Sequence, residues 1–246
     1  MFLHRDTLRA NLFTPVIFLI LLLVVSTVLA AETATVSGRM LMKNGSPLSG
    51  GFVVVFDLQS GVPPAPERYF LPPDYHEKIN NDGSFRMLLP AGEYAIGAVK
   101  LREGKAGPPG EGDIYFIIKD EDLELKRIVV PENGHIDLGN VAAGEIFRPV
   151  PDPSKPVTSV SGRIIDTRGN PVKGVVATAV LIRKGMKDLL FFSPETDSSG
   201  IYNLSLPFGG TYNVGTWGKA SADSASTNSI RIDTGGTLRG IDLQLQ

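Results

Sequence analysis

Val36-Ser37-Gly38-Arg39 recurs later in the chain as Val160-Ser161-Gly162-Arg163, and this repeat decides how the sequence divides. The same offset of 124 residues relates three further pairs, which are Gly45 and Gly169, Pro47 and Pro171, and Gly50 and Gly174. Self-similarity at a fixed spacing indicates a structural unit that occurs more than once. The sequence therefore predicts two copies of one unit, over 33–147 and 157–246, joined by a proline-rich linker over 148–156.

Short apolar runs separated by turns make up each copy. Runs such as 52–56 and 175–182 are rich in β-branched residues and too short for typical helices, which indicates strands. Turn composition follows at 81–84 and 197–200, where glycine accepts a positive φ and Asn, Asp and Ser can hydrogen-bond the backbone. We therefore expect an all-β protein of two tandem antiparallel β-sandwiches.

The punctuating residues follow one order in both copies: G-x-hydrophobic, G-x-P-hydrophobic-x-G, D-G-x-aromatic, L-P-x-G-x-Y and a closing D-L-x-hydrophobic strand. The matching residues are Gly38, Gly45, Pro47, Gly50, Asp82, Gly83, Phe85, Pro90, Gly92 and Tyr94, and then Gly162, Gly169, Pro171, Gly174, Gly200, Tyr202, Pro207, Gly209, Tyr212, Asp242 and Leu243. This order resembles the carboxypeptidase regulatory-like domain family. The second copy departs from the family pattern at Ser199, where Asp is usual, and it has one extra residue in its L-P-x-G-x-Y segment.

The resemblance implies a transthyretin-like (prealbumin-like) β-sandwich, which is similar to starch-binding-type modules. It also implies a non-catalytic scaffold or binding role, since domains of this family accompany catalytic, receptor or surface domains.

A basic and then apolar segment opens the sequence. Arg5 and Arg9 precede an uncharged run over 12–31, and Val28-Leu29-Ala30 matches a small-residue cleavage site. This predicts a signal peptide over 1–30, although a run of about 20 apolar residues also suffices for an uncleaved membrane anchor. In either case we expect export across the cytoplasmic membrane to the periplasm, the outer membrane or the medium, with membrane contact only through this segment if it is retained.

The composition excludes several classes of protein. A net charge of −2 provides no basic field for nucleic acid. The absence of cysteine excludes disulfides and thiolate metal sites. Neither His76 nor His135 has a Glu at the spacing of a zinc carboxypeptidase site. We therefore expect no enzymatic activity, no resident metal and no cofactor.

Two acidic segments resemble functional motifs without completing them. Asp233-Thr234-Gly235 resembles the aspartic protease triplet, but the first copy has no second triplet, and we expect a turn before the last strand. Asp120, Glu121 and Asp122 could offer oxygens to calcium, but no glycine supplies the sharp turn of a calcium loop. The sequence favours a solvated hairpin tip there and leaves a weak ion site as the alternative.

The first copy carries two insertions that the second lacks, over 61–75 and 102–113. Extra loops on a rigid scaffold commonly carry recognition, and aromatic and Arg side chains dominate binding hot spots. We therefore predict ligand or partner binding at Arg68, Tyr69, Phe70 and Tyr75. The alternative is that these rings cap the end of their own sandwich.

Trp217, the only tryptophan, is a fifth candidate. Its place in an expected strand favours core or half-buried packing, whereas an accessible ring on a fold similar to starch-binding modules would stack on a sugar. As a whole, the sequence predicts a non-catalytic extracytoplasmic binding or assembly module of a bacterial-type cell envelope, with an envelope protein or a glycan as partner. The alternatives are a carbohydrate-binding module and an accessory domain of a secreted enzyme complex.

Overall fold

The computed structural model describes residues 32–102, 107–148, 157–217 and 228–245. Within these ranges the chain forms strands, one short 3-10 helix and no α-helix, which confirms the all-β class. Thr33–Gln246 forms one compact unit. The predicted signal or anchor segment lies outside the described residues, and so does the predicted linker apart from Arg148. No helix in the described ranges is long and apolar enough to cross a membrane.

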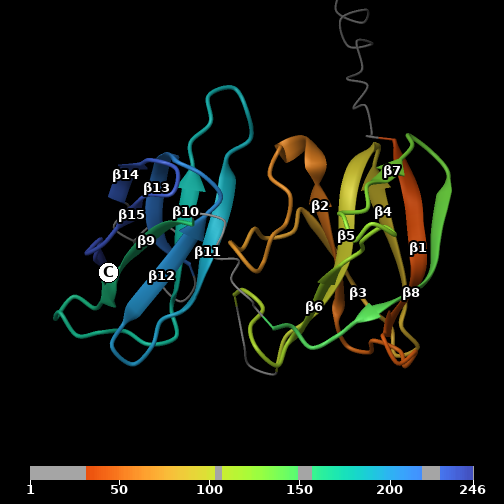
Figure 1. The fold of residues 1–246 in the computed structure, drawn as a ribbon, viewed down its shortest axis with the longest axis horizontal. Coiled ribbons are helices and arrows are strands. Elements are labelled where there is room, and N and C mark those ends of the chain that lie inside the picture. The colour runs from red at the N-terminus through yellow and green to blue at the C-terminus, as the bar shows by residue number, and fades with distance from the viewer. Residues whose placement is uncertain (1–31, 103–106, 149–156, 218–227, 246) are drawn as a thin grey trace, which may run out of the picture. The chain divides into compact units, whose positions relative to one another are not determined.

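The first sandwich consists of two sheets (Figure 1). One has the strand order β4-β1-β8 and is formed by β1 (Thr33–Met42), β4 (Ser84–Pro90) and β8 (His135–Gly144). The other has the order β3-β2-β5-β6, with β7 also paired to β5, and is formed by β2 (Phe52–Asp57), β3 (Tyr75–Lys78), β5 (Gly92–Lys100), β6 (Ile114–Ile117) and β7 (Ile128–Val130). The 3-10 helix η1 (Leu58–Ser60) directly follows β2.

The second sandwich repeats this plan. One sheet is formed by β9 (Thr158–Ile165), β12 (Ile201–Leu206) and β15 (Thr237–Leu238), with β16 (Leu243–Gln244) also paired to β9. The other has the order β11-β10-β13-β14 and is formed by β10 (Val176–Leu181), β11 (Leu189–Glu195), β13 (Gly210–Trp217) and β14 (Asn228–Ile232). The structure thus has two tandem β-sandwiches, as the sequence predicts, whereas the exact domain boundaries stay a prediction.

The repeated Val-Ser-Gly-Arg sequence lies at the same place in both sandwiches. Gly38 on β1 is opposite Phe85 on β4, and Gly162 on β9 is opposite Tyr202 on β12. A Cβ at Gly38 would lie 3.2 Å from the Phe85 ring, and a Cβ at Gly162 would overlap the carbonyl oxygen of Ile241. Glycine is therefore needed at Gly162, whereas at Gly38 a side chain would crowd its neighbours without overlapping them.

The closing strand of each sandwich runs parallel to its neighbour. β8 pairs in parallel with β1, and β15 and β16 pair in parallel with β9, while the other strand pairings are antiparallel. Parallel neighbours need a crossover connection. The crossover exists because the chain arrives at β8 from β7, which lies in the opposite sheet. The sequence predicted antiparallel hairpins from its turns and did not predict this parallel pairing.

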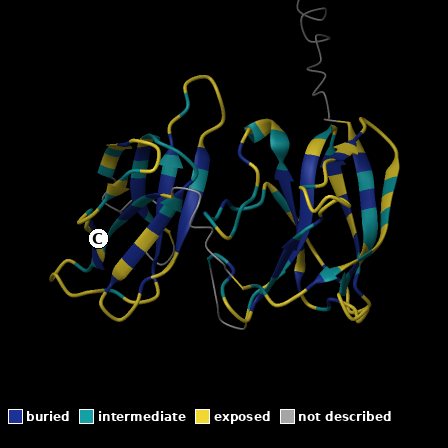
Figure 2. Cartoon of the chain, in the orientation of Figure 1, coloured by how far each residue is buried: buried dark blue, intermediate teal, exposed yellow. Residues whose placement is uncertain are grey.

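β2 buries both of its faces. Val53 and Val55 belong to the core of the first sandwich, whereas Val54 and Phe56 belong to an apolar cluster that also contains the core of the second sandwich. Figure 2 shows dark blue along the central strands and yellow mainly at the loops. Burial on both faces means that another layer covers the outer face of the β2 sheet, and that layer begins with the first insertion.

Candidate functional site

The first insertion folds into a turn that buries Tyr69. The backbone N–H of Tyr69 donates to the carbonyl oxygen of Ala65 at 2.8 Å, and the Tyr69 hydroxyl donates to that of Pro63 at 2.7 Å. Tyr69 is 6% exposed and belongs to the shared apolar cluster. Burial raises the pKa of its phenol to about 12, with smaller and opposed contributions from the charges of Arg68 and Glu67.

Phe70 joins this turn to the edge of the second sandwich. It forms an antiparallel bridge with Phe192 on β11, in which the Phe192 N–H donates to the Phe70 carbonyl oxygen at 3.1 Å. The neighbouring Tyr69 ring stands edge-on to Phe191, with ring centroids 5.9 Å apart. β11 is the edge strand of its sheet, so the insertion supplies a hydrogen-bond partner that the sheet does not provide there. In Figure 1 the orange segment after β2 approaches the cyan β11.

Two polar contacts flank this aromatic contact. Arg183 Nη1 donates to the carbonyl oxygen of Ser60 at 2.7 Å. Lys187 Nζ donates to Asp74 Oδ1 at 2.9 Å, while the other carboxylate oxygen of Asp74 accepts from the backbone N–H of Asp57 at 2.8 Å. The hydrogen bond to Asp74 holds the pKa of Lys187 above its ordinary value. Residues of the first copy therefore contact the second copy through backbone, ring and charge.

The second insertion also reaches the second sandwich. Its organising residue is Asp113, 1% exposed, whose carboxylate accepts from the backbone N–H groups of Arg102 at 2.9 Å and Gly110 at 2.8 Å. Gly107 has a φ of +83°, and a Cβ there would lie 3.2 Å from Cγ2 of Val176 on β10. Both insertions of the first copy thus contact the same sheet of the second copy.

Three aromatic rings form a row that spans the two copies. The centroids of Phe70 and Phe192 are 6.1 Å apart, and those of Phe192 and Trp217 are 5.5 Å apart. Phe192 is 9% exposed, whereas Trp217 at the end of the row is 52% exposed. We call Phe70, Phe192 and Trp217 the aromatic row. It brings together two candidates that lie far apart in the sequence, and it leaves the tryptophan ring accessible outside the core.

The remaining two candidates lie outside the aromatic row. Tyr75 begins β3, is half-buried against the core of the first sandwich, and stands edge-on to Tyr94 at 6.0 Å. Arg68 is half-buried, and its Nε has no hydrogen-bond partner in the described part of the chain. Partner binding by Arg68, Tyr69, Phe70, Tyr75 and Trp217 stays a prediction.

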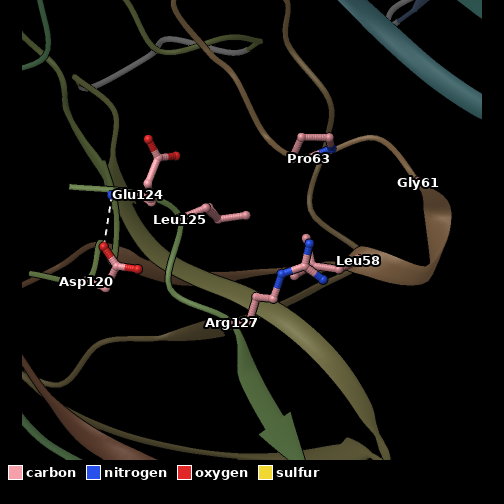
Figure 3. A pocket seen from close by; sticks show the side chains of 7 residues that line it. All are labelled: Leu58, Gly61, Pro63, Asp120, Glu124, Leu125 and Arg127. Carbon is pink, nitrogen blue, oxygen red and sulfur yellow. Dashed lines mark hydrogen bonds between the residues drawn. The ribbon is translucent and has the colours of Figure 1, made fainter. Parts of the chain in front are cut away.

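An open hollow of about 610 Å³ lies beside the first insertion (Figure 3). Its lining residues are Leu58, Gly61, Pro63, Asp120, Glu124, Leu125 and Arg127. None of these is aromatic, so the hollow offers no ring face on which a sugar could stack. Arg127 is engaged by Glu93, with Nη1 and Oε2 3.1 Å apart.

The acidic segment at the rim of this hollow is a hairpin tip. Asp120 Oδ1 accepts from the backbone N–H groups of Asp122 at 3.1 Å and Glu124 at 2.9 Å, and Leu123 takes the left-handed conformation with φ of 65°. Leu123 thus occupies the position for which glycine is usual. In the described ranges, no three His, Asp or Glu side chains lie close enough together to hold a metal ion. Asp120, Glu121 and Asp122, the alternative calcium site, do not form such a group either.

Sequence reasoning missed the residues of the second copy that receive the insertion, Arg183, Lys187, Phe191 and Phe192. One signal was present, because residues 189–192 read Leu-Leu-Phe-Phe without polar alternation. An edge strand of a sandwich normally alternates apolar and polar residues, and an unbroken apolar run indicates that both faces are covered. The sequence does not say what covers the second face.

No protein-family model matches the chain, and no curated protein matches it either. Solved structures similar to it include the Bacillus anthracis TIE protein, at 14% identity and a TM-score of 0.27, covering 87% of this chain and 34% of that chain. A Streptococcal ancillary pilin follows at 12% identity and 0.25, covering 88% and 63%. BcpA, the major pilin subunit of Bacillus cereus, is 10% identical at 0.27, covering 87% and 100%. The chain spans less than two thirds of the first two proteins, and superpositions at this level carry no argument about function.

Proposed function

We propose that this chain is a non-catalytic binding or assembly module that acts outside the cytoplasm, in the cell envelope. The observation that carries the proposal is the half-exposed Trp217 ring at the end of the aromatic row. Tryptophan is costly to leave in water and is enriched among the residues that anchor protein interfaces. The predicted export of the chain, which rests on residues 1–30, is part of this proposal.

The proposal includes membership of the carboxypeptidase regulatory-like family. Residues of the family pattern have equal roles in the two copies, which supports this membership. The tyrosine of L-P-x-G-x-Y donates its hydroxyl to a carbonyl oxygen four residues earlier in each case, from Tyr94 to Pro90 at 3.1 Å and from Tyr212 to Phe208 at 2.8 Å. Such a bond ties a strand to the turn before it, which explains why the pattern needs a tyrosine at that place.

Carbohydrate binding is the second candidate, and the same ring favours it. A pyranose ring stacks on an exposed aromatic face, and Trp217 is the described aromatic residue with the largest exposed fraction. The two candidates differ in the chemistry of the ligand and share the residue that would bind it. They can therefore be separated with one set of variants.

The test uses Trp217→Ala with Phe52→Ala as its matched control. Phe52 is 43% exposed on the first sandwich and lies outside the aromatic row, so its removal alters exposed aromatic area elsewhere. Tagged proteins are used to recover partners from envelope extract, and binding to purified envelope polysaccharides is measured by calorimetry. We expect Trp217→Ala to lower partner recovery at least about tenfold and Phe52→Ala to leave it unchanged.

The arms of this test separate the candidates. Recovery of one protein partner that survives glycosidase treatment supports an assembly module. Saturable binding of a polysaccharide that Trp217→Ala abolishes supports the carbohydrate candidate. Equal recovery with both variants, while both remain folded, contradicts the placement of the site at Trp217.

A further inference from the structure

The edge of β11 differs in character from the equivalent edge of the first copy. β11 begins with Leu189-Leu190-Phe191-Phe192, whereas β3, which occupies the same place beside β2, reads Tyr75-His76-Glu77-Lys78. Charged edge strands resist pairing with other chains, and apolar edge strands invite it. The second sandwich therefore needs a cover along this edge, and residues 69–71 supply it.

The contacts that hold this cover join two unlike surfaces. Phe70 meets Phe192, Asp74 meets Lys187, and Ser60 meets Arg183, so each contact has one partner in each copy. The chain passes from one copy to the other between β8 and β9, and among the described strands no sheet contains strands of both. The second sandwich of one molecule can thus take its cover from another molecule without breaking either sheet, which is the geometry of a reciprocal exchange.

We propose that the β11 edge is a strand-acceptor site for a second copy of this chain. Residues 69–71 of one chain replace those of the other, and two chains exchange their second sandwiches in a reciprocal dimer. The inference deepens the proposed function by naming a partner, and rests on it in taking the chain to be an assembly module.

Concentration decides between the closed monomer and the exchanged dimer. Both forms contain the same contacts, since the exchanged dimer makes each of them twice, between chains instead of within one. A tethered partner has an effective concentration in the millimolar range. The closed form therefore dominates in dilute solution, and the exchanged dimer accumulates as the protein becomes crowded.

Single thiols test the exchange, because the natural chain has no cysteine to interfere. Directly paired residues of neighbouring strands have Cα atoms about 5 Å apart, within reach of a disulfide. Full-length chains carrying Phe70→Cys and Phe192→Cys, with different affinity tags, are mixed, concentrated and oxidised with oxidised glutathione. We expect a disulfide between the two kinds of chain whose yield rises at least tenfold between micromolar and near-millimolar protein.

The double variant Phe70→Cys/Phe192→Cys controls for the bridge itself. It should form its disulfide within one chain in dilute solution. If the double variant closes but the mixed chains stay unlinked at every concentration, the contact is strictly internal and the proposal is wrong. If the double variant does not close either, the edge is not covered by residue 70 and the proposal is wrong as well.

A charge exchange tests the proposal without removing an aromatic ring. Asp74→Lys and Lys187→Asp each place like charges opposite one another, both within a chain and in a dimer of identical variants. When the two variants are mixed, opposite charges face each other at both contacts only in an exchanged dimer that contains one chain of each. Repulsion between like charges in all other forms therefore favours this mixed dimer. We expect native mass spectrometry to show the mixed dimer several-fold above either like dimer, with the excess falling as salt is added.

Lys43 and Glu145 provide the matched control for this experiment. Their ion pair lies within the first sandwich, with both side chains more than half exposed. Lys43→Glu mixed with Glu145→Lys should give no excess of mixed dimer, and an equal excess there contradicts the proposal. The two proposals fail in different experiments. If the proposed function is wrong, Trp217→Ala does not lower partner recovery, but the mixed dimer still forms. If the exchange is wrong, no mixed dimer forms, but partner recovery still depends on Trp217.

Discussion

Gly83 and Gly200 occupy equivalent turns in which the backbone leaves no room for a side chain. Their φ values are +85° and +71°, and a Cβ would lie 2.6 Å from the carbonyl oxygen of Met40 in one copy and of Ile164 in the other. Each glycine carbonyl also accepts from the same partner residue, at 2.9 Å from Met40 and 2.8 Å from Ile164. The two turns are thus pinned to the first strand of their sandwich.

Gly83→Ala should therefore destabilise the protein more than Gly45→Ala. Gly45 has nearly the same φ, +84°, but a Cβ there would meet nothing within 4 Å, so it carries the backbone strain alone. We expect losses of about 2–3 kcal/mol for Gly83→Ala and about 1 kcal/mol for Gly45→Ala, measured by urea denaturation. Equal losses would show that the contact with Met40 has no part in the requirement for glycine.

The departure at Ser199 is compensated by another residue. In the first copy Asp82 closes the turn, as Oδ1 accepts from the backbone N–H of Ser84 at 3.0 Å. In the second copy Asp197 does so, as Oδ1 accepts from the N–H groups of Ser199 at 2.8 Å and Ile201 at 3.0 Å. The side-chain acceptor is kept although its position in the sequence changes, because the turn needs an oxygen and not a particular register.

Among the elements, the second insertion depends on one buried carboxylate. Asp113 holds the segment by accepting from Arg102 and Gly110, and its own carbonyl oxygen accepts from the N–H of Phe147 at 2.7 Å. A loop without strands of its own needs such an acceptor, since buried backbone N–H groups otherwise remain unpaired. The sequence predicted a polar loop over 102–113 but not this organising residue.

Asp113→Ala should cost about 1–3 kcal/mol in the free energy of unfolding, because it removes a buried carboxylate that accepts from two backbone N–H groups and pairs with the Arg102 guanidinium. Asp120→Ala is the matched control, since Asp120 also accepts two backbone N–H groups, at 3.1 and 2.9 Å, but is exposed to water. We expect a loss below about 1 kcal/mol for the control. Comparable losses in thermal and urea denaturation would mean that burial of Asp113 is not what matters.

At the scale of the whole molecule, the contact between the copies responds to alkaline pH through Tyr69. Its pKa is raised by burial from an ordinary value of 10.0 to about 12. A raised phenol pKa means that its contribution to stability is complete below pH 10 and is lost as the pH rises through 12, because the unfolded state ionises first. Stability should therefore fall between pH 9 and 12 in part because of this residue.

The substitution Tyr69→Phe isolates the contribution of Tyr69 ionisation to this alkaline loss of stability. The substitution removes the ionisable group and the hydrogen bond to Pro63, and keeps the ring against Phe191. It should lower stability at pH 8 and reduce the further loss between pH 8 and 11, as measured by urea denaturation at each pH. A loss between pH 8 and 11 equal to that of the natural chain would show that Tyr69 is not the group whose ionisation loosens the contact.

The fold class and the repeat can both be predicted from the amino-acid sequence, because both depend on local patterns of residues. Strand-length apolar runs, turn glycines such as Gly83 and Gly200, and the paired Gly38 and Gly162 report on neighbours a few residues away or directly across a sheet. Such signals survive without knowledge of the rest of the chain. The two insertions were also visible, since one copy contains residues that the other lacks.

The surfaces that the insertions contact could not be predicted from the sequence and are known from the fold. Phe70 meets Phe192 across more than a hundred residues of sequence, and Asp74 meets Lys187 in the same way. A pattern of apolar residues shows that a face is buried, but not which surface buries it, because apolar attraction has no direction and does not label its partner. The placement of the first insertion on the β11 edge, and with it the aromatic row, therefore depended on how the two sandwiches pack.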